Sequence, residues 1–301
     1  MTIRAEIIAD SISTAGIRLT TMQLRYPRFI HAEFMTHRAF SRNASSSRAI
    51  PVAKLIEDVQ RDPAAPIYWG KNQPGMQARE EHSSLVDVPM EDVEFDDGGG
   101  HMARAIGYEL MSSTDAWLEA KDRAIEMAEA FSKAGYHKQI VNRLLEPFAH
   151  INVVVTATEW DNFYHLRSHP DAQPEIQVLS DQMKTVQFCS TPKLLQPGEW
   201  HTPYVESYEH LEPDVAKQVS AARCARVSYL THDGKPPDVA RDLELFYSLV
   251  GSQPLHASPC EHQATPDEPI IHPRRDWADR ELHGNFNGWV QHRKIVERHI
   301  K

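Results

Sequence analysis

Alternating and continuous apolar positions predict the strands of this chain. Residues 3–9 and 17–25 carry β-branched and apolar side chains with partial alternation, which predicts two strands. The run 151–155 is apolar and β-branched throughout, which predicts a buried strand. The proline-rich stretch 191–213 and the tail 262–280 are predicted to be loops.

Helical spacing predicts most of the remaining elements. Pro27 can open a helix that runs to Met35, and 103–133 has helical periodicity, with Thr114 as a candidate cap and Gly135 as its stop. The stretch 160–183 is predicted to be helical but interrupted or bent near its prolines, Pro170 and Pro174. The other predicted helices are 51–58, 137–145, 213–226, 237–250 and 289–299.

Two segments are predicted to be irregular. Residues 41–48 are rich in small polar side chains, which compete for backbone hydrogen bonds and favour loops. Residues 63–100 are rich in Pro, Gly and charge, and are predicted to form a long irregular insertion that could act as a lid. The predicted fold is α+β, helix-rich, with residues 1–301 forming a single domain.

Composition narrows the class of protein. The 301 residues are 41% hydrophobic and 25% charged, which is enough for a sizeable core. No apolar run reaches the roughly 18–20 residues that a membrane span needs, and the first residues are too polar for a signal peptide. Three cysteines are too few for a disulfide framework, so we expect a cytoplasmic protein without a membrane partner.

Charge is unevenly placed along the chain. The net charge of −10 argues against a stable nucleic-acid partner, yet five arginines lie between residues 25 and 48 against one acid, Glu33. Within this stretch, 37–48 reads His-Arg-Ala-Phe-Ser-Arg-Asn-Ala-Ser-Ser-Ser-Arg. Guanidinium groups, an imidazole and several hydroxyls suit phosphate recognition. On composition alone, a solvated basic turn is an equally good interpretation.

The spacing of this segment resembles the signature of the flavin-dependent thymidylate synthases, Arg-His-Arg-x-x-Ser-x-Asn-x-x-Ser-x-Arg. Thr36 replaces the leading arginine. The positions in register are His37, Arg38, Ser41, Asn43, Ser46 and Arg48.

Two further blocks resemble the same family. Residues 143–147, Arg-Leu-Leu-Glu-Pro, resemble its Arg-x-x-Leu-Pro segment with Glu146 in place of Leu, and 162–177 resembles its central helix. Residues 222–229 and 256–262 resemble its Ala-Arg-Val-Ser and His-x-Ser/Thr-Pro-Phe-Glu-His elements. Those elements come first in the family and last here, so the resemblance implies a circular permutation, which neighbouring termini permit.

The resemblance implies a small antiparallel sheet, a homotetramer and a methyltransferase of dTMP biosynthesis. Such a flavoprotein methylates dUMP with FAD, NADPH and 5,10-methylenetetrahydrofolate, the flavin carrying the redox chemistry. It implies catalytic roles for Arg167, His37 and Arg38, with Arg167 stabilising charge on the pyrimidine. Cofactor contacts are implied for His37, Arg38, Asn43, Asn162, Ser228, His256, Ser258 and Glu261. Substrate contacts are implied for Glu33, Ser46, Ser47, Arg48, Arg143 and Arg167.

Departures from the family pattern keep alternatives open. Glu33 replaces a Gln beside the nucleotide, Ala44 replaces a Glu, and Thr156 and Thr158 replace an Asn-x-Arg flavin contact. A carboxylate at Glu33 could accept from a cytosine amino group, so dCMP or transfer of a hydroxymethyl group is an alternative.

Two other classes also stay open. One is a non-catalytic binder of nucleotides or single strands. The other is a metal hydrolase that uses His256, Cys260 and His262, although a structural zinc site usually needs four ligands, and we expect no metal.

Overall fold

A five-stranded sheet organises the protein. The computed structural model describes residues 2–96, 102–206, 209–228, 238–253, 255–270 and 276–298. The strand order is β3-β6-β2-β1-β7, all antiparallel except β7, which runs parallel to β1. The strands are β1 (Arg4–Ser13), β2 (Arg18–Pro27), β3 (Ser41–Ala44), β6 (His150–Ala157) and β7 (Lys193–Leu195).

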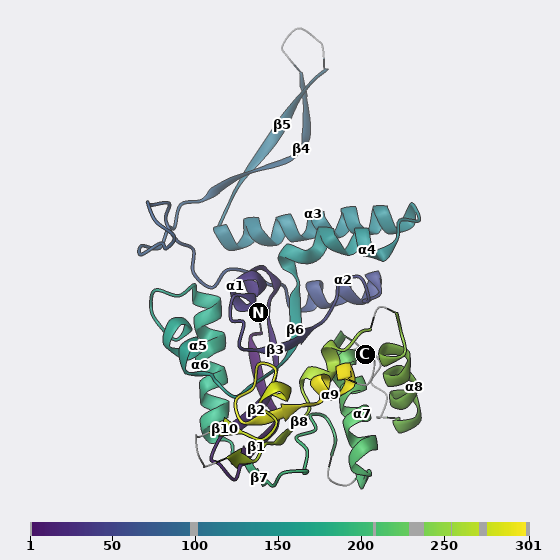
Figure 1. Ribbon diagram of the computed structural model, residues 1–301. Coiled ribbons are helices and arrows are strands. Elements are labelled where there is room, and N and C mark those ends of the chain that lie inside the picture. The colour runs from purple at the N-terminus through teal and green to yellow at the C-terminus, as the bar shows by residue number, and fades with distance from the viewer. Residues whose placement is uncertain are drawn as a thin grey trace.

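One face of this sheet carries the largest hydrophobic core. Side chains that alternate along β2, such as Met22, Leu24 and Tyr26, point to this face and are fully buried. The face is covered by α1 (His31–Met35), by α5 (Asp161–Arg167) and by α6 (Pro174–Cys189), whose Ile176 and Leu179 join the same core (Figure 1).

The opposite face is covered by the C-terminal part of the chain (Figure 1). Val154 on β6 packs there against Cys224 and Val227. The covering helical elements are α7 (Pro213–Ala225), η4 (Arg226–Ser228), α8 (Val239–Val250), η5 (Ser258–Glu261), η6 (Arg280–Leu282) and α9 (His292–Arg298). Short strands pair beside them, β8 (Ala264–Pro266) with β11 (Trp289–Gln291) and β9 (Pro269–Ile270) with β10 (Asp276–Trp277).

A second core lies at one end of the sheet. It joins α2 (Val52–Arg61), α3 (Ser113–Lys133), α4 (Lys138–Val141) and η2 (Asn142–Phe148). From this end a two-stranded hairpin, β4 (Val86–Asp96) and β5 (Met102–Met111), extends away from the rest of the molecule (Figure 1).

The hairpin corrects two predictions. Residues 86–96 are a strand rather than irregular chain, and 103–111 is its partner rather than the start of a helix. The cross-strand hydrogen bonds of the pair outweigh the weak helical periodicity of 103–111. The helix begins at Ser113 instead, because the Ser112 side chain accepts a hydrogen bond from the Asp115 backbone N–H; Thr114 is not the cap.

Other elements agree with expectation, with adjustments at their ends. The predicted break near Pro170 and Pro174 separates α5 from α6. The predicted loops contain short strands, β7 in 191–213 and β8, β9 and β10 in 262–280, while 289–291 is strand and only 292–298 is helix. No helix in the described ranges is long and apolar enough to cross a membrane.

Candidate active site

The middle of the signature segment 37–48 is strand β3, so the segment contributes one strand to the sheet. Residues 41–44 are a strand rather than the predicted loop, paired with β6 in the register Ser41↔Thr156 and Asn43↔Val154. Their small polar side chains do not break the strand because Ser41 and Asn43 face the C-terminal elements, which supply hydrogen-bond partners. Three groups of candidate residues therefore follow one another along β3: an entry cluster, a central cluster and an exit corner.

The entry cluster consists of Thr36, His37, Arg38 and Arg167. Arg167 Nε donates to His37 Nε2 at 3.0 Å, and Arg167 Nη2 donates to Thr36 Oγ1 at 3.3 Å. The His37 ring packs edge-on against Phe163, with centroids 4.8 Å apart. Burial, and then the nearby guanidinium groups, lower the pKa of His37 to about 4.

A neutral His37 has one acceptor nitrogen, and the contact from Arg167 uses it. The ring is therefore the tautomer that carries its proton on Nδ1. Both partners that Arg167 has among the described residues are uncharged, so they orient the guanidinium group without neutralising it. Such a group can stabilise negative charge that develops on a bound molecule.

Two other predicted residues lie beside this cluster. Arg38 is exposed, and Asn162 is exposed on α5, the helix that carries Arg167. Arg42, which alternates to the other face of β3, donates to the backbone oxygens of Met35 and His37 at 3.1 and 3.0 Å. These contacts fix the turn that presents His37 and Arg38.

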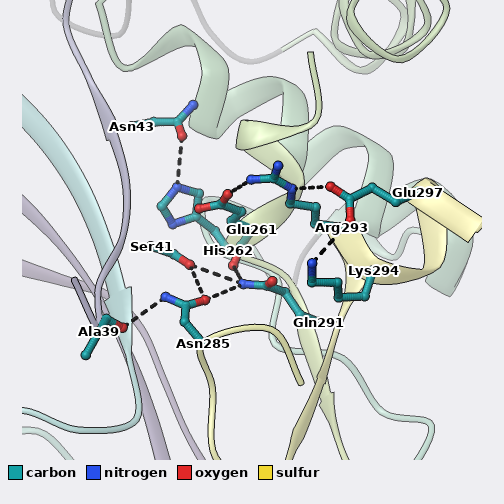
Figure 2. A network of polar contacts seen from close by, with 10 residues as sticks. All are labelled: Ala39, Ser41, Asn43, Glu261, His262, Asn285, Gln291, Arg293, Lys294 and Glu297. Atoms are coloured by element: carbon teal, nitrogen blue, oxygen red, sulfur yellow. Dashed lines mark hydrogen bonds and ion pairs between the residues drawn. The ribbon is translucent and has the colours of Figure 1, made fainter. Parts of the chain in front are cut away.

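The central cluster joins β3 to the C-terminal elements (Figure 2) and consists of Ser41, Asn43, Glu261, His262, Asn285, Gln291 and Arg293. His262 Nε2 lies 3.4 Å from Asn43 Oδ1. In the other amide orientation, the Asn43 nitrogen donates to the Ser258 carbonyl oxygen at 3.2 Å. The Glu261 carboxylate forms an ion pair with Arg293, so it is not a free acceptor.

A second set of contacts in this cluster ties β3 to β11. Gln291 Nε2 donates to Ser41 Oγ at 3.1 Å and to the Glu261 backbone oxygen at 2.9 Å. Asn285 Nδ2 donates to the Ala39 carbonyl oxygen at 2.9 Å (Figure 2). The start of β3 is therefore held by residues about 250 positions later in the chain.

His262 also begins a cross-sheet hydrogen-bond chain. Its Nδ1 lies 2.8 Å from Thr156 Oγ1, which lies 2.7 Å from Thr21 Oγ1. Thr21 Oγ1 lies 2.8 Å from His201 Nε2, and His201 Nδ1 lies 2.8 Å from Ser11 Oγ. Burial lowers the pKa of both histidines to about 3, so both are neutral.

The Asn43 amide sets the direction of the protons along this chain. Each hydroxyl has one proton, and each neutral imidazole has one donor and one acceptor. With the amide nitrogen toward the Arg42 and Ser258 carbonyl oxygens and toward His262, Asn43 donates to His262 Nε2, His262 Nδ1 donates to Thr156, and the same polarity continues to Ser11. Thr156, at a position implied to face flavin, is instead fully buried within this chain.

The exit corner contains the residues predicted to hold phosphate. Ser47 Oγ donates to Glu146 Oε1 at 2.7 Å, while Arg28 and Arg143 approach the same carboxylate at 3.2 and 3.7 Å. Arg48 is exposed. The turn itself is fixed because Asn142 Nδ2 donates to the Ser47 and Ile50 carbonyl oxygens; Ser46 is half-buried within it.

Glu33 has an unusual environment. It lies in the first turn of α1, and its Oε2 atom is buried and accepts no hydrogen bond from the described residues. A buried carboxylate oxygen usually has a donor, so this atom indicates a place where a bound molecule could supply one.

The structure brings together most, but not all, of the predicted site. The η4 element, which contains Ser228, contacts β3 and β6, and η5 contacts β3, as a circular permutation requires. The Ser228 side chain lies outside the described residues, and His256 and Ser258 are exposed. In the described part of the chain, no three His, Cys, Asp or Glu side chains gather in a way that could hold a metal ion.

Several residues of these clusters were not predicted. Arg28, His201, Asn285, Gln291 and Arg293 make the contacts described above but stand in no recognisable motif. Only the tertiary structure places them, since each lies far along the chain from its partner. Their periodicity and composition carry no signal that could have found them.

Comparison with known proteins identifies the family. Residues 17–189 match the family model described as thymidylate synthase complementing protein. The chain belongs to this family. The match contains the entry cluster and the exit corner, confirms the predicted relationship and makes the protein a methyltransferase of the thymidylate synthase type. The blocks at 222–229 and 256–262 lie outside it.

No curated protein matches this chain. Among solved structures, it is similar to a UMP/dUMP methylase PolB from Streptomyces cacaoi bound with 5-Br dUMP, at 18% identity and a TM-score of 0.39, covering 62% of this chain and 90% of that one. The same methylase bound with 5-Br UMP matches at 16% identity and a TM-score of 0.38, covering 62% and 88%. Likenesses at this level carry no information on substrate.

Proposed function

We propose that the protein is a flavin-dependent enzyme that methylates C5 of a pyrimidine deoxynucleotide, with dUMP as the simplest substrate. The methylene carbon of 5,10-methylenetetrahydrofolate bonds to C5 while its two bonds to folate nitrogens break, and those nitrogens take up protons. C5 loses its proton, and NADPH supplies a hydride, the two electrons that reduce the new group to methyl. The products are dTMP, tetrahydrofolate and NADP⁺. The observation that carries this proposal is the Arg167 guanidinium group, held by neutral His37 at 3.0 Å.

The donor set fits a flavin dinucleotide in part. The exposed groups of Arg38, Asn162, His256 and Ser258 offer a guanidinium, an amide, an imidazole and a hydroxyl, which suit a pyrophosphate and a ring edge. Thr156 does not fit, because its hydroxyl is buried and bonded within the protein. A bound flavin would supply the redox chemistry at this site.

The protein's own residues position the substrate and stabilise charge. Arg167 would stabilise the negative charge that develops on the pyrimidine ring, because its partners among the described residues are uncharged and its partial burial strengthens the interaction. Ser46, Ser47, Arg48 and Arg143 would hold the nucleotide phosphate. We further propose a homotetramer, as the family resemblance implies.

The unpartnered Glu33 oxygen favours dCMP as a second candidate substrate. A carboxylate accepts hydrogen bonds only, and the exocyclic amino group of cytosine donates, whereas the matching position of uracil is a carbonyl that would repel it. Transfer of a hydroxymethyl rather than a methyl group belongs to the same alternative.

One experiment tests these proposals together. The protein is incubated with FAD, NADPH, 5,10-methylenetetrahydrofolate and either dUMP or dCMP, and the product masses are read. We expect bleaching of the flavin absorbance on addition of NADPH and a methylated product. Arg167→Lys should lower kcat strongly, because lysine lacks the planar fork that contacts both His37 and Thr36. Exposed Arg61→Lys is the matched control.

Each outcome has a consequence. Protein that never binds FAD, or Arg167→Lys with normal kcat, would contradict the proposal. If dCMP is the substrate, Glu33→Gln should shift preference toward dUMP, because the amide can donate to the uracil carbonyl. An unchanged preference would exclude Glu33 from base recognition.

A further inference from the structure

The exit corner has the donors of a site that binds an oxyanion, and the carboxylate of Glu146 occupies those donors. The Glu146 carboxylate accepts from the Ser47 hydroxyl at 2.7 Å, and the guanidinium groups of Arg28 and Arg143 lie 3.2 and 3.7 Å from it. A hydroxyl and two guanidinium groups around one anionic group is the chemistry that binds phosphate. Here the chain's own side chain provides the anion.

Glu146 does not neutralise all of the positive charge beside it. Glu146 neutralises only one of the two guanidinium groups beside it, Arg28 and Arg143, and Arg143 is 63% exposed. Glu146 itself is only 22% exposed, so its charge acts on the corner with limited screening by water. A phosphate group that approaches Arg143 is attracted by both arginines and repelled by Glu146.

We propose that Glu146 is a tethered competitor that weakens binding of phosphate-bearing ligands at Ser47, Arg28 and Arg143. Competition is the expected result because carboxylate and phosphate use the same donors and carry charge of the same sign. The inference that this corner binds an oxyanion depends only on these contacts. The further statement that the oxyanion is the phosphate of a pyrimidine nucleotide rests on the proposed function.

The test is Glu146→Gln in the full-length protein. Glutamine keeps the length of the side chain and an oxygen that can accept from Ser47, but removes the negative charge. Dissociation constants for inorganic phosphate, dUMP and deoxyuridine are measured by calorimetry at one ionic strength. We expect binding of phosphate and of dUMP to tighten at least tenfold, and that of deoxyuridine to change less than twofold.

Two further variants sharpen the result. Glu57→Gln, on α2 with its side chain 60% exposed, makes the same change in net charge and should leave all three constants unchanged. Glu146→Leu should act in the same direction as Glu146→Gln, so the test survives if one variant folds poorly. Far-ultraviolet circular dichroism confirms that each variant is folded.

Three results would overturn the inference: unchanged or weaker phosphate binding in both Glu146 variants, an equal gain in Glu57→Gln, or no phosphate binding in any form. Failure of the proposed function gives a different pattern. In that case the constants for inorganic phosphate still respond to Glu146, while dUMP binds no better than phosphate does and no product forms.

Discussion

The cross-sheet hydrogen-bond chain makes a quantitative prediction for Thr156→Val. Valine has nearly the shape of threonine, so the backbone of β6 and the packing around it should be kept. The hydroxyl is lost, and it lies 2.7 Å from Thr21 Oγ1 and 2.8 Å from His262 Nδ1. Both partners are fully buried, so water cannot replace the missing group at low cost.

The expected destabilisation follows from these two orphaned groups. Leaving a buried donor or acceptor unpaired costs about 1–3 kcal/mol. Two such groups give about 2–6 kcal/mol, with the lower values applying if the side chains of Thr21 and His262 can turn toward one another. For a protein of this size, a loss of this order lowers Tm by roughly 3–10 °C.

Thermal unfolding at pH 7.5, followed by tryptophan fluorescence, measures the change. Thr191→Val, on the exposed chain before β7, is the matched control and should change stability by less than about 0.5 kcal/mol. A double mutant Thr156→Val/His262→Phe should lose less than the sum of the two single mutants, because both remove the same contact. A loss below about 1 kcal/mol in Thr156→Val would refute the chain as a stabilising unit.

Three further predictions concern stability. Burial lowers the pKa of His201 to about 3 in the folded protein, against a usual value near 6.5. As pH falls below 6.5, the unfolded chain therefore binds a proton at His201 before the folded protein does, and the folded protein loses stability. Tm should drop less between pH 7.5 and 5 in His201→Asn than in wild type, and equal drops would contradict this. Arg223→Met should cost about 3–5 kcal/mol in denaturant unfolding, because it leaves the largely buried Glu209 without its 2.7 Å partner and removes one of two cationic partners of the fully buried Asp242, which keeps Arg226. A neutral effect would show that Arg223 is dispensable for stability. Ser112→Ala should cost about 1 kcal/mol of stability, because it removes the N-cap of α3. Amide hydrogen exchange in the first turn of α3 should become faster, and unchanged exchange would show that water caps the helix equally well.

Local pattern was sufficient for the strands and helices that have strong periodicity. The predicted strands at 3–9, 17–25 and 151–155 correspond to β1, β2 and β6, and the break at Pro170 separates two helices. Pattern failed where tertiary pairing decides the conformation. The small polar residues of β3 favour a loop by themselves, yet β6 on one side and the C-terminal elements on the face supply the hydrogen bonds that keep them extended.

The sequence predicts the motif residues of the site but not the residues that contact them. His37 and Arg167 stand in recognisable segments, and the structure joins them. The pairing of Ser47 with Glu146 follows from contacts 99 residues apart, so no spacing rule could reveal it. The placement of His262 against Asn43 agrees with the circular permutation that the resemblance implies, while the roles of Ser228, His256 and Ser258 stay predictions.

The sheet has a consequence for dissecting this protein. The stretch recognised by the family stops at Cys189, yet β7 begins at Lys193 and pairs with β1, and His201 and His262 satisfy hydroxyls on two central strands. A fragment that ended at Cys189 would retain every recognisable motif of that stretch and expose a face lined by Thr21, Val154 and Thr156. The part of the chain that can fold alone is therefore longer than the part that matches the family model. A truncated protein made for expression or crystallisation should keep the C-terminal elements that cover the sheet.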